Sequence, residues 1–250
     1  MNTRIQSIEI LRNCNKGRRK YALCLGLLIP VLTTVALVLN ILMRYSGYLP
    51  FESQTRGLTL WEVLIQENHK LLGWGIMLPG IIVILSGVLY YGMKDKEVRE
   101  TELFEGRNFY FHNYVQLFSV SLVMVSLNTL GIYIVGAWIG IGESVDISVF
   151  SKYLLIQYAT VFGIAAIQNC LFTWTRNGYK AMKLGFFGWI IAVLLFRSTS
   201  TLMIFWPYAH SLLSKGIMGH NATLSMKGGV ITAVMFYIIG AARIRKGQGV

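Results

Sequence analysis

The chain has 250 residues, of which 54% are hydrophobic and 14% are charged, and its formal net charge is +12 at pH 7. A soluble domain of this length could not hide so much apolar surface, whereas a bilayer removes the need to hide it. The basic residues fall mostly on alternate sides of the apolar stretches, so we expect them to meet anionic membrane headgroups and not nucleic acid.

Six long apolar stretches fill the chain. About 20 apolar residues in a helix cross the hydrocarbon core of a bilayer. The stretches predict transmembrane helices near residues 22–43, 71–93, 116–140, 153–174, 184–205 and 228–242. They use about half of the chain, which leaves no room for a separate soluble domain of ordinary size. The predicted fold is an all-α polytopic membrane protein with six transmembrane helices, forming a single transmembrane domain over residues 1–250.

The lysines and arginines between these stretches predict an orientation. With the amino terminus inside, 16 of the 23 Lys and Arg residues lie on the inner side and 7 on the outer side. Lys and Arg are enriched in cytoplasmic loops. We therefore expect a multi-pass protein of the cell membrane, with both termini in the cytoplasm.

The segment before the first span is basic and carries apolar residues at helical spacing. Ile5, Ile8 and Leu11 recur on one side, with Arg4 and Arg12 among the surrounding cations. This pattern favours an interfacial amphipathic elbow helix over residues 1–20. The alternative is a disordered basic tail that serves only as a topology signal.

The first outer loop contains a short amphipathic stretch. Residues 59–66 read Thr-Leu-Trp-Glu-Val-Leu-Ile-Gln and predict a short helix at the outer interface. Tryptophan is enriched at membrane–water interfaces, so Trp61 is expected to anchor this helix in the membrane surface.

The first inner loop, residues 94–114, is the most charged segment of the chain. Gly106 predicts a break there, so we expect a short helix on the inner face followed by a turn into the third span. That span ends outside with Gly136-Ala-Trp-Ile-Gly140, a small-residue pattern that permits close contact between helices.

The region 198–227 is too apolar for a free loop and too broken for another crossing. Pro207 cannot donate a backbone hydrogen bond and disfavours helix at Trp206. We therefore expect re-entrant half-helices folded back on the outer side, with Trp206 and Tyr208 near the interface. Together with Arg197 near the outer boundary, Trp206, Pro207 and Tyr208 are a candidate outer gate. The alternatives are a snorkelling arginine and a passive aromatic belt.

The chain lacks the sequence motifs of an enzyme. It has no H-E-x-x-H, no G-x-S-x-G and no Walker A sequence, so we expect neither catalysis nor ATP binding through a P-loop in this chain. The cysteines show no metal-ligand spacing, and no cofactor or metal is expected. No Asp or Glu lies within a span, which argues against a proton- or sodium-coupled transporter. The uncharged polar residues of the spans predict hydrogen bonds between helices; they are Asn40, Asn128, Thr129, Gln157, Gln168 and Asn169.

Taken in order, these features resemble the membrane subunits of type-2 ABC exporters. The similarity covers essentially the whole chain and is greatest to the permeases of lantibiotic-immunity and phenol-soluble-modulin (antimicrobial peptide) exporters. Residues 95–112 match the position of the family's coupling helix, and residues 175–188 look like its second inner turn. Phe205-Trp-Pro-Tyr208 looks like its Pro-aromatic outer element. The chain departs from the family at Glu105-Gly-Arg-Asn108, where a Pro-containing turn is usual.

The resemblance implies a permease that exports amphipathic peptides, with a second copy or a related permease beside it. It implies two copies of a cytosolic ABC ATPase that bind ATP and Mg²⁺, and a bacterial membrane around the complex. ATPase coupling would fall to five residues of the first inner loop: Glu97, Glu100, Leu103, Phe104 and Arg107. Two other classes stay open. One is a non-transporting immunity or sensor partner that binds such peptides, and the other is an intramembrane enzyme.

Overall fold

In a computed structural model, the described residues are 2–45, 58–71, 74–90, 95–198, 201–213 and 220–248. Side chains are described within residues 20–43, 58–68, 74–90, 109–198, 201–212 and 222–244. Within these parts every regular element is a helix. The long helices are α1 (Asn2–Tyr45), α3 (Leu60–Leu71), α4 (Trp74–Tyr90), α5 (Asp95–Trp138), α6 (Ile147–Thr175), α7 (Gly178–Arg197) and α9 (His220–Gln248). The short elements are η1 (Thr201–Phe205), η2 (Pro207–Ala209) and α8 (His210–Leu213).

Five helices in the described part of the chain are long and apolar enough to cross a membrane. The spans are Lys20–Met43, Phe109–Trp138, Ile147–Thr175, Gly178–Arg197 and Ala222–Ile244. Helix α4 is also apolar, but its 17 residues extend for only about 26 Å. These spans define an α-helical, multi-pass membrane protein.

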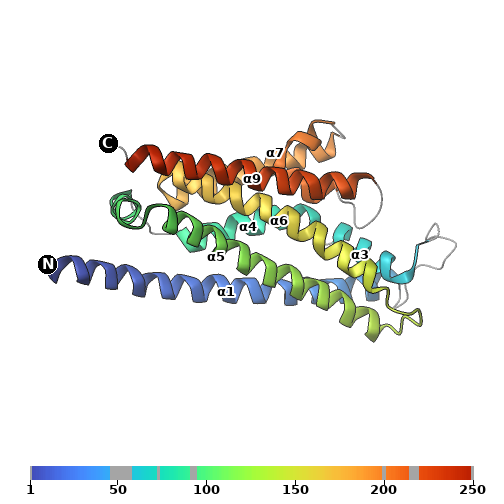
Figure 1. Ribbon diagram of the computed structural model, residues 1–250. Helices are drawn as coiled ribbons and strands as arrows, with labels where there is room; N and C mark the ends of the chain where they lie inside the picture. The colour runs from blue at the N-terminus through green and yellow to red at the C-terminus, as the bar shows by residue number, and fades with distance from the viewer. Residues whose placement is uncertain are drawn as a thin grey trace.

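The long helices run side by side along one axis (Figure 1). The start of α1 and the end of α9 lie at the same end of the bundle, which we call the termini end (Figure 1). Helix α3 lies toward the opposite end, which we call the α3 end. An even number of crossings would place the two termini on one side of a membrane.

The first helix does not divide where the sequence predicts an elbow. Helix α1 continues from Asn2 to Tyr45 and is straight in Figure 1. The expected helix over residues 1–20 is therefore present over its described part, but it is continuous with the first span. Gly17 is the one strong helix-weakening residue near the expected boundary, and a single glycine costs a helix only about 1 kcal/mol.

The first inner loop is helical. One helix, α5, runs from Asp95 to Trp138, so no non-helical residue separates the predicted inner helix from the third span. The first turns of α5 are seen end-on in Figure 1, so they point away from the axis that the rest of the helix follows.

Helix α6 is the centre of the bundle. In its most apolar window 67% of the residues are buried, against 22% in α1 and 22% in α7. Helices α6 and α9 cross closely at two glycines: a Cβ on Gly163 would lie 2.7 Å from the carbonyl oxygen of Gly229. Small residues let transmembrane helices approach in this way.

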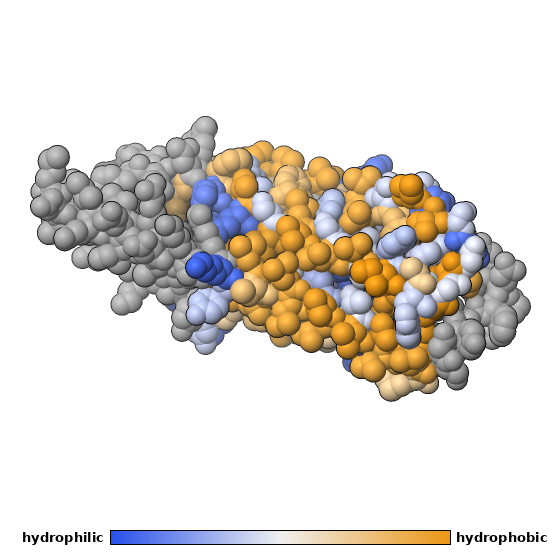
Figure 2. Space-filling model, turned by 90° about the horizontal axis from the view of Figure 1, so that it is seen from below, coloured by the Kyte–Doolittle hydropathy of each residue, from blue (hydrophilic) through white to orange (hydrophobic). Residues whose placement is uncertain are grey.

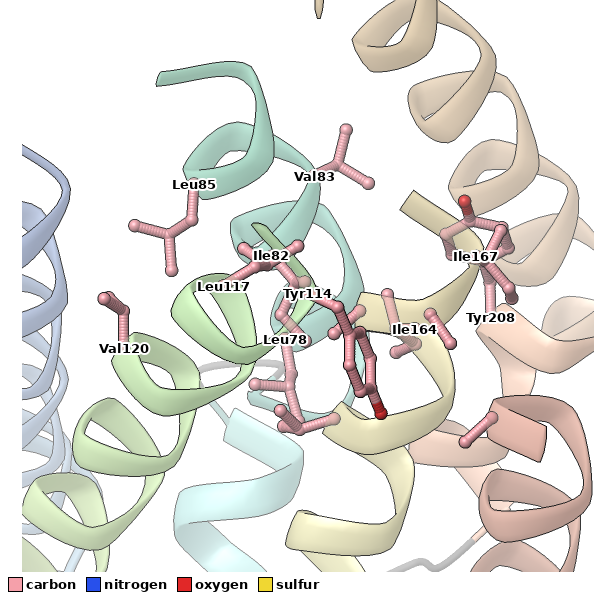
Figure 3. Packing of buried hydrophobic residues seen from close by; sticks show 14 of the residues in the cluster. Leu78, Ile82, Val83, Leu85, Tyr114, Leu117, Val120, Ile164, Ile167 and Tyr208 are labelled. Carbon is pink, nitrogen blue, oxygen red and sulfur yellow. The ribbon is translucent and has the colours of Figure 1, made fainter. Parts of the chain in front are cut away.

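The main apolar cluster lies between α4, α5 and α6. Leu78 and Ile82 of α4 face Leu117 of α5 and Ile164 of α6 within it, as Figure 3 shows. All four side chains are at most 1% exposed. The outside of the bundle is apolar as well: Figure 2 shows a broad hydrophobic band across the face seen from below. Such a band suits contact with lipid.

Helix α3 forms as predicted, but Trp61 does not act as a membrane anchor. A capping box starts the helix, because the backbone N–H of Thr59 donates to Glu62 at 2.9 Å and the backbone N–H of Glu62 donates to the hydroxyl of Thr59 at 3.2 Å. Trp61 is only 3% exposed and is stacked on Tyr133. A Cβ on Gly136 would collide with the indole of Trp61, so only a glycine at this position lets α3 pack closely against α5.

Candidate functional site

Between α7 and α9 the chain folds back on itself. The described part of this region, residues 201–213, holds η1, η2 and α8, and we call it the returning segment. Trp206 is extended, with φ −97° and ψ 108°, and Pro207 is the first residue of η2. This is the interruption that the Trp-Pro pair predicts, because proline disfavours helix at the residue before it.

The returning segment runs back along α7 to the middle of that helix. The indole N–H of Trp206 donates to the carbonyl oxygen of Gly188 at 2.8 Å. A Cβ on Gly188 would lie 2.6 Å from the ring of Tyr208, so only glycine leaves room for that ring. Gly188 is nine residues before Arg197, which corresponds to about 14 Å along the helix axis.

Two other helices hold the returning segment. The hydroxyl of Ser211 donates to the carbonyl oxygen of Gly75 in α4 at 2.6 Å. The hydroxyl of Ser225 in α9 donates to the carbonyl oxygen of His210. The His210 ring lies 3.1 Å from the carbonyl oxygen of Ile204 and packs against Gly228. The segment is therefore part of the bundle and not a free loop.

A chain of uncharged polar groups continues inward from Tyr208. Its hydroxyl accepts a hydrogen bond from the side-chain amide of Gln168 in α6. The hydroxyl of Ser86 in α4 donates to the other atom of that amide at 3.1 Å. All three side chains are buried. Figure 3 shows Tyr208 beside Ile167, at the margin of the apolar cluster.

The next residue of α6, Asn169, forms hydrogen bonds that connect α4, α5 and α6. The hydroxyl of Tyr90 donates to the side-chain oxygen of Asn169 at 3.2 Å. The amide N–H of Asn169 donates to the carbonyl oxygen of Tyr110 in α5 at 3.0 Å. Hydrogen bonds between transmembrane helices were predicted for Gln168 and Asn169, and both form.

A third polar group lies toward the α3 end and is not satisfied. Asn68 of α3 and Gln157 of α6 have no hydrogen-bond partner for either side-chain atom among the described residues, and both are at most 1% exposed. Tyr153 precedes Gln157 by one turn, and its hydroxyl lies beside the side chain of Asn68. Buried polar groups without partners are costly, so this set would lower stability unless residues outside the described part satisfy it.

The candidate gate residues do not all meet. Arg197 is exposed at the end of α7, whereas Trp206 and Tyr208 contact Gly188. The two rings thus lie about two and a half helical turns away from Arg197. Pro207 starts the turn of η2 between them.

The five candidate coupling residues, Glu97, Glu100, Leu103, Phe104 and Arg107, lie in the first turns of α5. Their side chains are outside the described residues. The position of this helical stretch next to the termini end is visible in Figure 1.

Sequence reasoning did not single out Ser86, Asn68 or Tyr153. A serine or tyrosine inside an apolar run carries no signal of its partner, and these partners lie on other helices. Among the described side chains, no group of three or more His, Cys, Asp or Glu residues is placed to hold a metal ion.

The site thus consists of the returning segment and the buried, hydrogen-bonded side chains of Tyr208, Gln168 and Ser86, within a multi-pass helical membrane protein. Comparison of the chain with protein families, with curated proteins and with solved structures finds no match. The structure and the sequence therefore carry the functional argument alone.

Proposed function

We propose that this chain is the permease subunit of an ATP-driven exporter, which moves amphipathic antimicrobial peptides from the cytosol or the inner leaflet to the outside. The observation that carries this proposal is the returning segment between α7 and α9. The resemblance to peptide-exporting permeases implies a Pro-aromatic, re-entrant element at this place in the chain. Trp206, Pro207 and Tyr208 fold back there against Gly188 of α7.

The lack of a carboxylate within the described membrane spans supports the same proposal. Transport that is coupled to protons or sodium usually relies on a carboxylate inside the membrane. The described acidic side chains, Glu62, Glu67, Glu143 and Asp146, all lie in α3 or in the loop between α5 and α6. A transporter without carboxylates in its spans needs another source of energy, and a separate ATPase would supply it.

In this proposal both termini face the cytoplasm of a bacterial cell, and α4 adds a crossing to the five long spans, the second of six in chain order. The first turns of α5 would dock into two copies of an ABC ATPase, and a second permease would complete the membrane domain. Trp206 and Tyr208 would then form the inner part of an exit path whose outer rim holds Arg197.

Affinity purification of the tagged chain from its native membrane tests the class. An ABC ATPase should co-purify in stoichiometric amount, and the cells should tolerate an amphipathic peptide better than cells that lack the chain. Peptide tolerance without a co-purifying ATPase would instead identify a non-transporting immunity or sensor partner. Stoichiometric ATPase with ATP-dependent peptide efflux from vesicles would establish the exporter.

Labelling of single cysteines tests the orientation. Cysteines at Ser53 and Ser214 should react with an impermeant reagent from outside the cell, and a cysteine at Thr101 should not. Both positions at the predicted outer side lie outside the described residues, so the labelling reports on topology independently of the bundle. The opposite pattern would remove the proposed ATPase face.

A further inference from the structure

One face of α7 is apolar over most of its length and ends in two lysines. The buried side of this helix consists of small residues, among them Ala181, Gly185 and Gly188. The opposite side is exposed and repeats at helical spacing. Its residues, in order from the termini end, are Lys180, Lys183, Leu184, Phe187, Ile190 and Leu194. We call this face the α7 stripe.

The apolar part of the α7 stripe has the length of one lipid leaflet. From Lys183 to Leu194 the helix rises about 16 Å. Half of the hydrocarbon core of a bilayer is about 15 Å thick. The exposed side chains between these two residues are all apolar, and Phe187 is 63% exposed. This stripe therefore matches an acyl chain in depth and in polarity.

The two lysines lie at one end of the α7 stripe. The Nζ atom of Lys183 is 4.4 Å from the centre of the Tyr179 ring, so the ring holds the ammonium group at the end of the stripe. An ammonium group has three donors, and an aromatic face occupies only one side of it. Trp174, at the end of α6, is 60% exposed near the same turn. Tryptophan and tyrosine favour the headgroup level of membranes.

The charge at this turn also selects the ligand. Lys180 and Lys183 are exposed and present positive charge next to an apolar stripe, which is complementary to an anionic phosphate joined to an acyl chain. A polar protein partner would gain little from an apolar stripe of this length.

We propose that the α7 stripe binds an anionic phospholipid. Lys180 and Lys183 contact its phosphate, and Leu184, Phe187, Ile190 and Leu194 lie along an acyl chain. The inference requires that the protein is embedded in a membrane, but it does not depend on peptide export. Because the lipid contacts α7 on the side opposite Gly188, it would support the helix against which the returning segment packs.

The test uses the full-length chain purified in dodecyl maltoside. Dioleoyl phosphatidylglycerol is titrated against dioleoyl phosphatidylcholine, and bound lipid is counted by native mass spectrometry while thermal unfolding is followed. Phosphatidylglycerol should bind more tightly than phosphatidylcholine and raise the unfolding temperature. Since each cation near an anionic surface contributes about 1 kcal/mol, the double variant Lys180→Gln, Lys183→Gln should bind phosphatidylglycerol about 30-fold more weakly.

Two control variants define the result. Lys152→Gln removes an exposed lysine from the other end of α6 and should leave the affinity unchanged. Lys180→Arg with Lys183→Arg keeps both charges and should retain most of the binding. Equal affinity for the two lipids, or unchanged affinity in the Gln double variant, would overturn the proposal. So would a double variant that loses ATPase co-purification while its lipid binding stays normal, because the lysines would then belong to a protein interface.

Discussion

The hydroxyl of Tyr208 accepts a hydrogen bond from the amide of Gln168, which lies 40 residues earlier in the chain. Both side chains are at most 5% exposed. This bond joins the returning segment to the central helix of the bundle in the protein interior. The position of the returning segment therefore depends on a small number of specific contacts.

Tyr208→Phe should weaken this attachment. The substitution keeps the ring against Gly188 but leaves the amide N–H of Gln168 without its acceptor. Loss of one partner from a buried pair costs about 1–2 kcal/mol. Thermal unfolding of the purified protein measures the effect. Tyr21→Phe is the matched control, because Tyr21 is 69% exposed and should tolerate the loss of its hydroxyl. Equal behaviour of the two variants would contradict the role of this bond.

Gly188→Ala should displace the returning segment without removing any hydrogen-bonding group. The new methyl group would lie 2.6 Å from the Tyr208 ring, which is closer than side-chain carbons approach in real structures. We expect a loss of stability of about 1–3 kcal/mol. Under the proposed function, peptide efflux should also fall more than the basal ATPase rate.

Gly142→Ala is the control for this substitution, because a Cβ on Gly142 meets nothing within 4 Å. A normal unfolding temperature and normal efflux in Gly188→Ala would show that the segment has room to move. The ring of Tyr208 would then not be fixed by α7.

The sequence predicts the membrane class and most of the helices, because hydropathy is a property of each stretch by itself. It also predicts the interruption at Trp206, since the conformational restriction by Pro207 is local. The apolar stretch at residues 71–93 is confirmed as helix over its described part, Trp74–Tyr90.

Contacts between distant residues are what the sequence does not reveal. Trp61 has the pattern of an interfacial anchor, and its burial follows from Tyr133 and Phe150, which belong to other helices. Tyr208 follows the interruption that Pro207 predicts, but its burial against α7 follows from the absence of a side chain on Gly188. In both cases the decisive partner is remote in sequence and carries no local signal.

The crossing of α6 and α9 gives a third prediction. A Cβ on Gly229 would meet the carbonyl oxygen of Ala159, and a Cβ on Gly163 would meet that of Gly229. Backbone atoms cannot turn aside as a side chain can, so Gly229→Ala should force the helices apart and cost about 2 kcal/mol or more. The yield of folded protein in size-exclusion chromatography and its unfolding temperature should both fall. Gly142→Ala again serves as control, and a stable Gly229→Ala variant would contradict the close crossing.

The unsatisfied group near the α3 end leads to a prediction of opposite sign. Gln157 is fully buried, and neither atom of its amide has a hydrogen-bond partner among the described residues. Leucine is similar in size and has no polar atoms, so Gln157→Leu should remove the cost of the unpaired amide. We expect the protein to become more stable by about 1–3 kcal/mol.

The matched control is Gln168→Leu, in which the same chemical change removes bonds to Ser86 and Tyr208 and should destabilise the protein. The two glutamines lie on one helix, are equally buried and are 11 residues apart, so the hydrogen bonds are the main difference between them. If Gln157→Leu lowers the unfolding temperature as Gln168→Leu does, the amide of Gln157 has a partner beyond the described residues. If Gln157→Leu raises the unfolding temperature while lowering peptide efflux, the native glutamine serves transport at a cost in stability, as polar groups inside membranes often do.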